Sequence, residues 1–221
     1  FDCQVILDFR DPFANNHRFE DSFLNKQIKT YFEKSFIKEA NHVIAVNNEC
    51  LKLMALNKTL QNKFHIIENG FDENIIEQVN FHINNVHNGP IKFIYAGKFY
   101  NDISPFIFLN VISAPEYSDD FSFLYVGENS KALQKVENIH NINVLSKMNY
   151  PGTIELIASS DVGVIFTGGK SFESTTKVFD YIGLEKPILI ITDGKIETGN
   201  LYNITKDYPK VFWTENNESS I

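Results

Sequence analysis

Cysteine is scarce in this 221-residue chain, which has only Cys3 and Cys50. Two cysteines are too few for the disulfide framework of a small secreted protein, so we expect a reducing compartment. Cys50 stands in an apolar helical pattern, and we expect it to be a buried structural thiol and not a nucleophile.

Basic charge and long apolar runs are lacking as well. The 20 Lys and Arg residues are outnumbered by 28 Asp and Glu residues, which gives a formal net charge of −8. Because nucleic-acid binding needs clustered Lys and Arg, we expect no nucleic-acid partner. No apolar run approaches the roughly 18–20 residues of a membrane-spanning helix, so we expect a cytoplasmic protein.

Short apolar runs are abundant, and segments with helical spacing lie between many of them. Most runs have apolar residues at successive positions, as expected for strands that are covered on both faces. Alternating strands and helices predict βαβ units and a parallel sheet. The sequence therefore predicts a doubly wound α/β fold with strands in QVILDF, HVIAV, FHII, IKFIYAG, FSFLYVG, INVLS, VGVIF, PILII and KVFWT.

The clearest boundary follows FHIIENGFDEN, because Asn69-Gly70 is a turn signal and the next residues are rich in Asn. We predict the C-terminal part of one Rossmann-like domain at 1–70, a linker at 71–90 and a second Rossmann-like domain at 91–221. The chain begins at Phe1 and soon enters a strand pattern, so we expect a piece of a longer protein. In the first domain a helix is expected over 22–40, with an apolar face formed by Phe23, Ile28, Phe32, Phe36 and Ala40.

Ligands of open parallel sheets bind beyond the carboxyl ends of the strands, which makes two glycine turns candidates. Gly97 and Lys98 follow the run IKFIYA, where glycine allows close backbone approach and the lysine can meet a phosphate. Gly127 and Glu128 end the run FSFLYVG and could border a nucleotide base or ribose. The alternative in both places is a simple turn with solvated side chains.

A third candidate is the stretch FTGGKSFESTTKVFDY, in which a glycine loop leads from a strand into a helix. Ser174, Thr175 or Thr176 can cap this helix, and Lys177 adds a positive charge to its first turn. A cation there is unfavourable for the helix alone, so we predict a bound anion. The alternative is a surface ion pair between Lys177 and Asp180, worth under about 0.5 kcal/mol.

A fourth candidate is ILDFRDPF, where Arg10 and Asp11 follow a strand and are expected to face a cleft. The alternative is an ion pair between Arg10 and a neighbouring Asp that fixes the loop. The six histidines are scattered and no metal-ligand spacing occurs, so we predict no metal site. No Gly-rich dinucleotide fingerprint follows any strand, which makes a dehydrogenase the least favoured enzyme.

Seven motifs succeed one another along nearly the whole chain: VILDFRDPF, EANHVIAVNNECLKLM, KFHIIENGFDEN, IKFIYAGKFY, FLYVG, ASSDVGVIF and TTKVFDYIGLEKPILII. In this order they resemble the group 1 (family 4) glycosyltransferases of the GT-B fold. These enzymes pair two Rossmann-like domains across a cleft and hold a nucleotide-sugar donor mainly in the second domain. The resemblance implies that the chain covers the end of an acceptor-side domain and a donor domain.

The resemblance also implies roles for the candidate residues. Asp180 would receive the ribose hydroxyls, and Lys98 and Lys177 would meet the diphosphate. Arg10, Asp11 and Glu173 are the implied catalytic residues. The predicted donor site also includes the residues that the strand ends and the helix start point to: Gly97, Gly127, Glu128, Ser174, Thr175 and Thr176.

The implied activity is a retaining sugar transfer in the parent protein, which belongs to polysaccharide biosynthesis; the fragment alone is expected to be inactive. The donor is a nucleotide-diphosphate sugar, so no further cofactor is expected. The acceptor is a glycan or a lipid-linked molecule, which implies peripheral association of the full-length protein with the inner face of a membrane.

The sequence departs from the family pattern at three places, which keeps other functions open. The partner acid of Asp180 would fall on Phe172, one position before Glu173; a second basic residue is missing from NDISP; and Arg10 stands where many members have His. The alternatives are a catalytically inactive GT-B-like binding module and a nucleotide-sugar epimerase.

Overall fold

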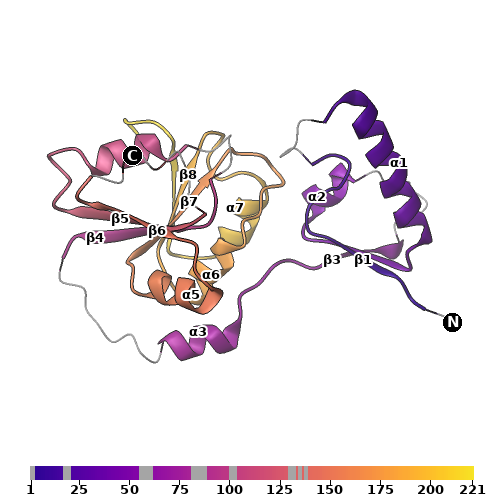
Figure 1. The fold of residues 1–221 in the computed structure, drawn as a ribbon, viewed down its shortest axis with the longest axis horizontal. Helices are drawn as coiled ribbons and strands as arrows, with labels where there is room; N and C mark the ends of the chain where they lie inside the picture. The colour runs from indigo at the N-terminus through magenta and orange to yellow at the C-terminus, as the bar shows by residue number, and fades with distance from the viewer. Residues whose placement is uncertain are drawn as a thin grey trace. The chain divides into compact units, whose positions relative to one another are not determined.

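The computed structural model describes residues 3–16, 21–54, 62–80, 89–99, 104–128, 133, 136 and 139–221. The chain divides into two compact units, Phe1–Asn69 and Gly70–Ile221, and each unit is built on a parallel sheet (Figure 1). Every apolar run that is predicted to be a strand contains one. The prediction of an α/β fold with parallel sheets is therefore confirmed.

The first unit has a three-stranded sheet in the order β1-β2-β3. Its elements are β1 (Ile6–Phe9), α1 (Phe23–Glu39), β2 (His42–Ala45), α2 (Asn48–Leu53) and β3 (Phe64–Ile66). Cys50 is buried in α2, as the sequence predicts. The core of this unit consists of Ile37, Ala40, Val43, Ala45 and Met54.

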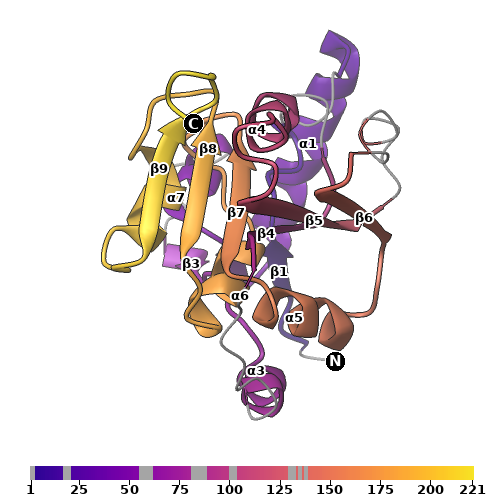
Figure 2. The same ribbon diagram turned by 90° about the vertical axis from the view of Figure 1, so that its left-hand side faces the viewer.

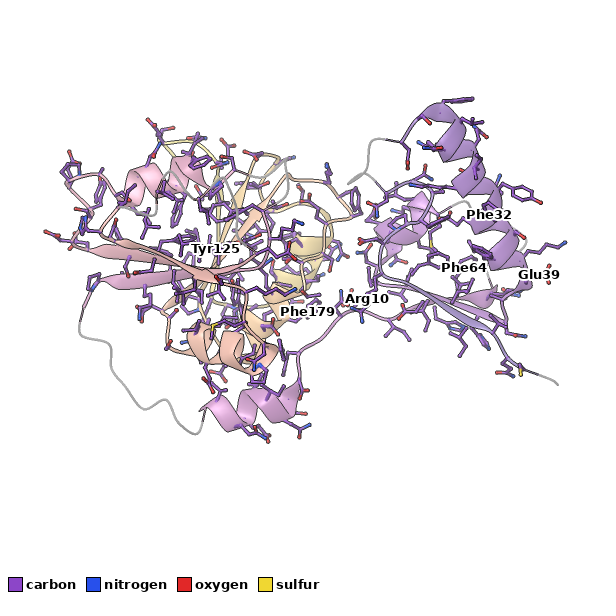
Figure 3. The ribbon with its side chains drawn as sticks, in the orientation of Figure 1. Arg10, Phe32, Glu39, Phe64, Tyr125 and Phe179 are labelled. Carbon is purple, nitrogen blue, oxygen red and sulfur yellow. The ribbon has the colours of Figure 1, made fainter. Side chains whose placement is uncertain are left out.

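Helix α1 packs with a different face from the one predicted. Its buried residues are Glu33 and Ile37, whereas most of the expected stripe is exposed; Phe32, labelled in Figure 3, is 45% exposed. The reason is that the Glu33 carboxylate accepts hydrogen bonds from the backbone N–H groups of Phe13 and Ala14, at 3.0 and 2.8 Å. These bonds satisfy a buried carboxylate, which apolar periodicity does not anticipate.

The second unit has a six-stranded sheet in the order β6-β5-β4-β7-β8-β9, and each strand runs parallel to its neighbours (Figure 2). The order reverses between β4 and β7, which is the switch point of a doubly wound sheet. The strands are β4 (Ile91–Ala96), β5 (Phe121–Gly127), β6 (Ile142–Ser146), β7 (Val162–Thr167), β8 (Ile188–Thr192) and β9 (Val211–Glu215).

Helices cover both faces of this sheet, and each face has its own apolar cluster. The helices α3 (Glu73–Asn80), α5 (Tyr150–Ala158), α6 (Lys177–Gly183) and α7 (Gly199–Thr205) contribute to one cluster, and α4 (Phe106–Ile112) contributes to the other. Helix α3 lies in the segment expected to be a linker, yet its Ile76 and Val79 are buried in the first cluster. Residues 81–88 of that segment lie outside the described residues.

Tyr181 of α6 fills the space where β4 and β7 diverge. These strands pair at only two positions, Phe93 with Val162 and Ile94 with Gly163. The Tyr181 side chain is fully buried, and its hydroxyl lies 3.2 Å from the Ile94 carbonyl and 3.3 Å from the Val164 carbonyl. The hydroxyl thus serves one carbonyl from each strand. Position 163 must be glycine because a Cβ there would lie 2.5 Å from the Tyr181 ring.

Replacement of Tyr181 by Phe should lower the free energy of unfolding of the second unit by about 1–2 kcal/mol. The ring still fits, but the two strand carbonyls lose their shared donor. Urea unfolding followed by the fluorescence of Trp213, the single tryptophan, measures the change in this unit. Tyr117→Phe is the control, since Tyr117 is 47% exposed, and it should change stability by less than about 0.5 kcal/mol. Equal stability of Tyr181→Phe and the unmodified chain would contradict this role.

Candidate functional site

Strands β4 and β5 are neighbours in the second sheet, and their ends lie together at its carboxyl edge, where all the strands of this sheet end. The Gly97 N–H donates to the Val126 carbonyl at 2.8 Å. A Cβ on Gly127 would overlap the Gly97 carbonyl oxygen and crowd the Tyr125 ring, so only glycine fits at position 127. Gly97 itself has a φ of 141°, which L side chains rarely adopt. Both predicted glycines are therefore needed to bring these two strand ends together.

Charged side chains from three neighbouring strand ends meet beside these glycines. The Lys98 amine lies 3.0 Å from Glu128 Oε2, and the Lys147 amine lies 3.8 Å from Glu128 Oε1. The hydrogen bond from Lys98 is the main reason that the pKa of the Glu128 carboxyl is lowered. Lys147 follows β6 and is not among the predicted site residues. The sequence does offer a signal for it, because it is a charged residue directly after a strand.

The Lys177 amine lies next to Gly97 as well. Its amine donates to the Thr175 hydroxyl at 3.1 Å and stands 4.6 Å from the centre of the Tyr95 ring. A Cβ on Gly97 would lie only 2.9 Å from this amine. The missing side chain at Gly97 thus gives the lysine its place, and the ring face of Tyr95 stabilises the positive charge.

Three stacked aromatic rings support the strand ends. The centre of the Phe99 ring lies 4.4 Å from the centre of the Tyr95 ring and 5.4 Å from the centre of the Tyr125 ring, and the ring planes are nearly parallel. The Tyr95 hydroxyl donates to the Lys98 carbonyl at 2.9 Å, and the Tyr125 hydroxyl donates to the Glu128 carbonyl at 2.7 Å. Burial raises the pKa of Tyr125 to about 12, so its hydroxyl remains a donor at neutral pH. These two bonds fix the backbone that carries the charged side chains.

Asp180 has a partner that the sequence does not suggest. The Tyr150 hydroxyl, at the start of α5, donates to Asp180 Oδ1 at 2.6 Å. Burial raises the pKa of the Asp180 carboxyl, and the hydrogen bond from Tyr150 and the charge of Lys177 partly offset this effect. Burial and the neighbouring Asp180 raise the pKa of Tyr150 to about 12. Tyr150 thus binds Asp180 directly, and the charge of Lys177 also acts on this carboxyl.

The loop before α6 holds the other predicted residues of this stretch. Glu173 accepts a hydrogen bond from the Thr167 hydroxyl at the end of β7, which places its carboxylate at the switch point. Ser174 is half-buried in the loop. Thr176 occupies the N-cap position of α6, but its side chain makes no capping hydrogen bond. The Thr175 hydroxyl accepts a hydrogen bond from the Lys177 amine. The helix cap predicted for Ser174, Thr175 or Thr176 is therefore not observed.

Arg10, which is labelled in Figure 3, lies in the first unit directly after β1. Asp11 is the next residue. Arg10 is exposed and Asp11 is half-buried. The bonds from Phe13 and Ala14 to Glu33 hold the chain that follows them. Their catalytic role stays a prediction.

The structure thus brings most of the predicted donor-site residues together at one edge of the second unit. They are Gly97, Lys98, Gly127, Glu128, Thr175, Lys177 and Asp180. Sequence reasoning missed Lys147, although its place directly after a strand is a signal for it. It also missed Tyr150 and Tyr95, whose contacts with Asp180 and Lys177 join distant segments. Among the described residues, no group of His, Cys, Asp and Glu side chains could hold a metal ion. In the same part of the chain, every helix is too short or too polar to cross a membrane.

Replacement of Asp180 by Asn should leave the protein at least as stable as the unmodified chain at pH 7. When the pKa of an acid is raised in the folded state, the folded protein disfavours the ionised form of that acid. The protein therefore loses stability as the pH rises from the unfolded-state pKa through the folded-state pKa. Asn keeps the shape and an acceptor for Tyr150 but carries no charge. Thermal unfolding at pH 7 and at about pH 3.5, close to the ordinary Asp pKa, makes the comparison. The difference should shrink at the lower pH, and a large loss of stability at pH 7 would show that the ionised carboxylate is needed for folding.

No protein-family model matches the chain, and no curated protein matches it. Solved structures do match. A crystal structure of HepE from Anabaena, in complex with UDP and glucose, is 15% identical, with a TM-score of 0.66 over 98% of this chain and 59% of that one. A glycosyltransferase from Rickettsia africae is 16% identical, with a TM-score of 0.61 over 91% of this chain and 55% of that one.

A UDP-forming α,α-trehalose-phosphate synthase from Burkholderia xenovorans, in complex with glucose 6-phosphate, is 8% identical; its TM-score is 0.61 over 96% of this chain and 57% of that one. The chain therefore spans a little over half the length of the structures that it matches. Over that span, it has the α/β fold of the GT-B glycosyltransferases.

Proposed function

We propose that the parent protein transfers a sugar from a nucleotide-diphosphate donor, and that the second unit of this chain binds the nucleotide part of the donor. The observation that carries the proposal is the meeting of Lys98, Lys177 and the half-buried Asp180 at the switch point of the sheet. Ligands of doubly wound sheets bind at this point. The similarity of the fold to proteins solved with UDP or named as UDP-forming supports the nature of the ligand.

The diphosphate fits the two lysines and the backbone between them. Gly97 has no side chain of its own between the main chain and a ligand, and the Lys177 amine lies directly beside it. Lys98 and Lys177 supply positive charge beside this glycine. A sugar transfer leaves a nucleoside diphosphate with additional negative charge, and preorganised cations stabilise that leaving group.

The ribose fits the carboxylate of Asp180. A carboxylate has about four acceptor positions, and Tyr150 occupies one of them on Oδ1. The remaining positions can accept both hydroxyls of a vicinal diol. A half-buried carboxylate with a raised pKa is costly for a merely structural group, which supports a binding role for Asp180.

Glu173 is the residue proposed to meet the sugar, because Thr167 holds its carboxylate at the carboxyl end of β7. Arg10 and Asp11 are proposed to act from the first unit. A retaining outcome, a glycan or lipid-linked acceptor, a cytoplasmic location and peripheral membrane association rest on the sequence resemblance and stay predictions.

Calorimetric titration of the 221-residue chain with UDP and GDP tests the proposal. We expect one of them to bind, and Asp180→Ala to weaken it at least about tenfold, since even one hydrogen bond to a charged group contributes about 1.5–3 kcal/mol. Asp207→Ala, which removes an exposed acid from the same unit, should leave the affinity unchanged. The proposal fails if neither nucleotide binds at about millimolar concentration, the weak end of useful affinities.

A further inference from the structure

Three neighbouring strands each place one charged side chain at the same point of the site. Lys98 follows β4, Glu128 follows β5 and Lys147 follows β6, and these strands are adjacent in the sheet. The Glu128 carboxylate lies between the two amines, at 3.0 and 3.8 Å. The side chains of Lys98, Glu128 and Lys147 are 56%, 52% and 73% exposed. The cluster is thus open to solvent and to a ligand.

Stability does not account for this cluster. Ion pairs between exposed side chains contribute little to folding, because water and salt screen them and long side chains lose freedom. Two lysines that approach one point also repel each other unless an anion lies between them. Glu128 therefore marks a position where an anion is favoured.

We propose that Glu128 is an internal substitute for the diphosphate, and that Lys147 is the second basic residue of the diphosphate site alongside Lys98. On binding, phosphate oxygens take the place of the carboxylate between the two amines, and the Glu128 side chain turns to solvent. This inference rests on the proposed function of the same site.

The backbone around Glu128 suits such an exchange. The Tyr125 hydroxyl holds the Glu128 carbonyl at 2.7 Å, and Gly127 is fixed against Gly97. The carboxylate can therefore leave by side-chain rotation while the strand end stays in place. A ligand must replace a full negative charge, so Glu128 disfavours weakly charged ligands. This arrangement therefore favours the binding of diphosphates over the binding of monophosphates.

Calorimetry with UDP, UMP, uridine and inorganic pyrophosphate tests the inference on the full chain. Glu128→Gln should increase the affinity for UDP and pyrophosphate about two- to fivefold, because it removes the competing charge and keeps the side-chain shape. Lys147→Gln should weaken both ligands by a similar factor and reduce the dependence of their affinity on salt. The affinity of uridine should not change in either variant. The preference for UDP over UMP should narrow in Glu128→Gln.

The matched control is Glu185→Gln. Glu185 forms an exposed ion pair with Lys210 at 3.8 Å, at the opposite, amino edge of the same sheet. This change removes the same charge from the same unit, and it should leave all four affinities unchanged. Circular dichroism confirms that each variant is folded.

The outcomes separate this inference from the proposed function. If UDP binds the unmodified chain but Glu128→Gln binds it no more tightly, or Lys147→Gln no more weakly, the inference is wrong and the proposed function stands. If nucleotides do not bind but pyrophosphate responds to both substitutions, the anion site stands and the proposed function falls. If neither UDP nor pyrophosphate binds, both are overturned.

Discussion

Strands β4 and β7 pair at only two positions before they diverge, and the ligand edge of the second unit depends on this divergence. The opening leaves room at the carboxyl ends for the loop that carries Glu173 and for the first turn of α6. Tyr181 stabilises the opening, because its hydroxyl lies within hydrogen-bond distance of one carbonyl from each strand. Asp180 is its direct neighbour in sequence. Tyr181, which supports the opening, and Asp180, which is proposed to bind the ligand there, are thus held in place by the same turn of α6.

A local concentration of positive charge stands against the overall charge of the chain. The formal net charge is −8, yet Lys98, Lys147 and Lys177 collect around two glycines at one sheet edge. An acidic protein repels anions at long range, so an anionic ligand must be held by short-range contacts. The small residues and the stacked rings provide the rigid frame that such contacts need.

The strands were predictable because buried parallel strands are continuous apolar runs, and the order of the runs predicted the fold. Lys98 and Lys177 could be predicted to lie near this edge because the carboxyl ends of strands can be read from the sequence, whereas the role predicted for Asp180 came from the family resemblance. The part of Tyr150 was not predictable, since its contact with Asp180 joins residues 30 positions apart. The packing face of α1 was predicted wrongly because apolar periodicity carries no information about a carboxylate that binds backbone N–H groups.

The aromatic stack at the site gives the protein an optical property. The amine of Lys177 lies over the face of Tyr95, and that ring is stacked on Phe99. A tyrosine ring absorbs near-ultraviolet light at an energy that depends on the electric field around it. Any event that draws the ammonium group away from the ring alters this field, and with it the absorption of Tyr95, one of the nine tyrosines of the chain.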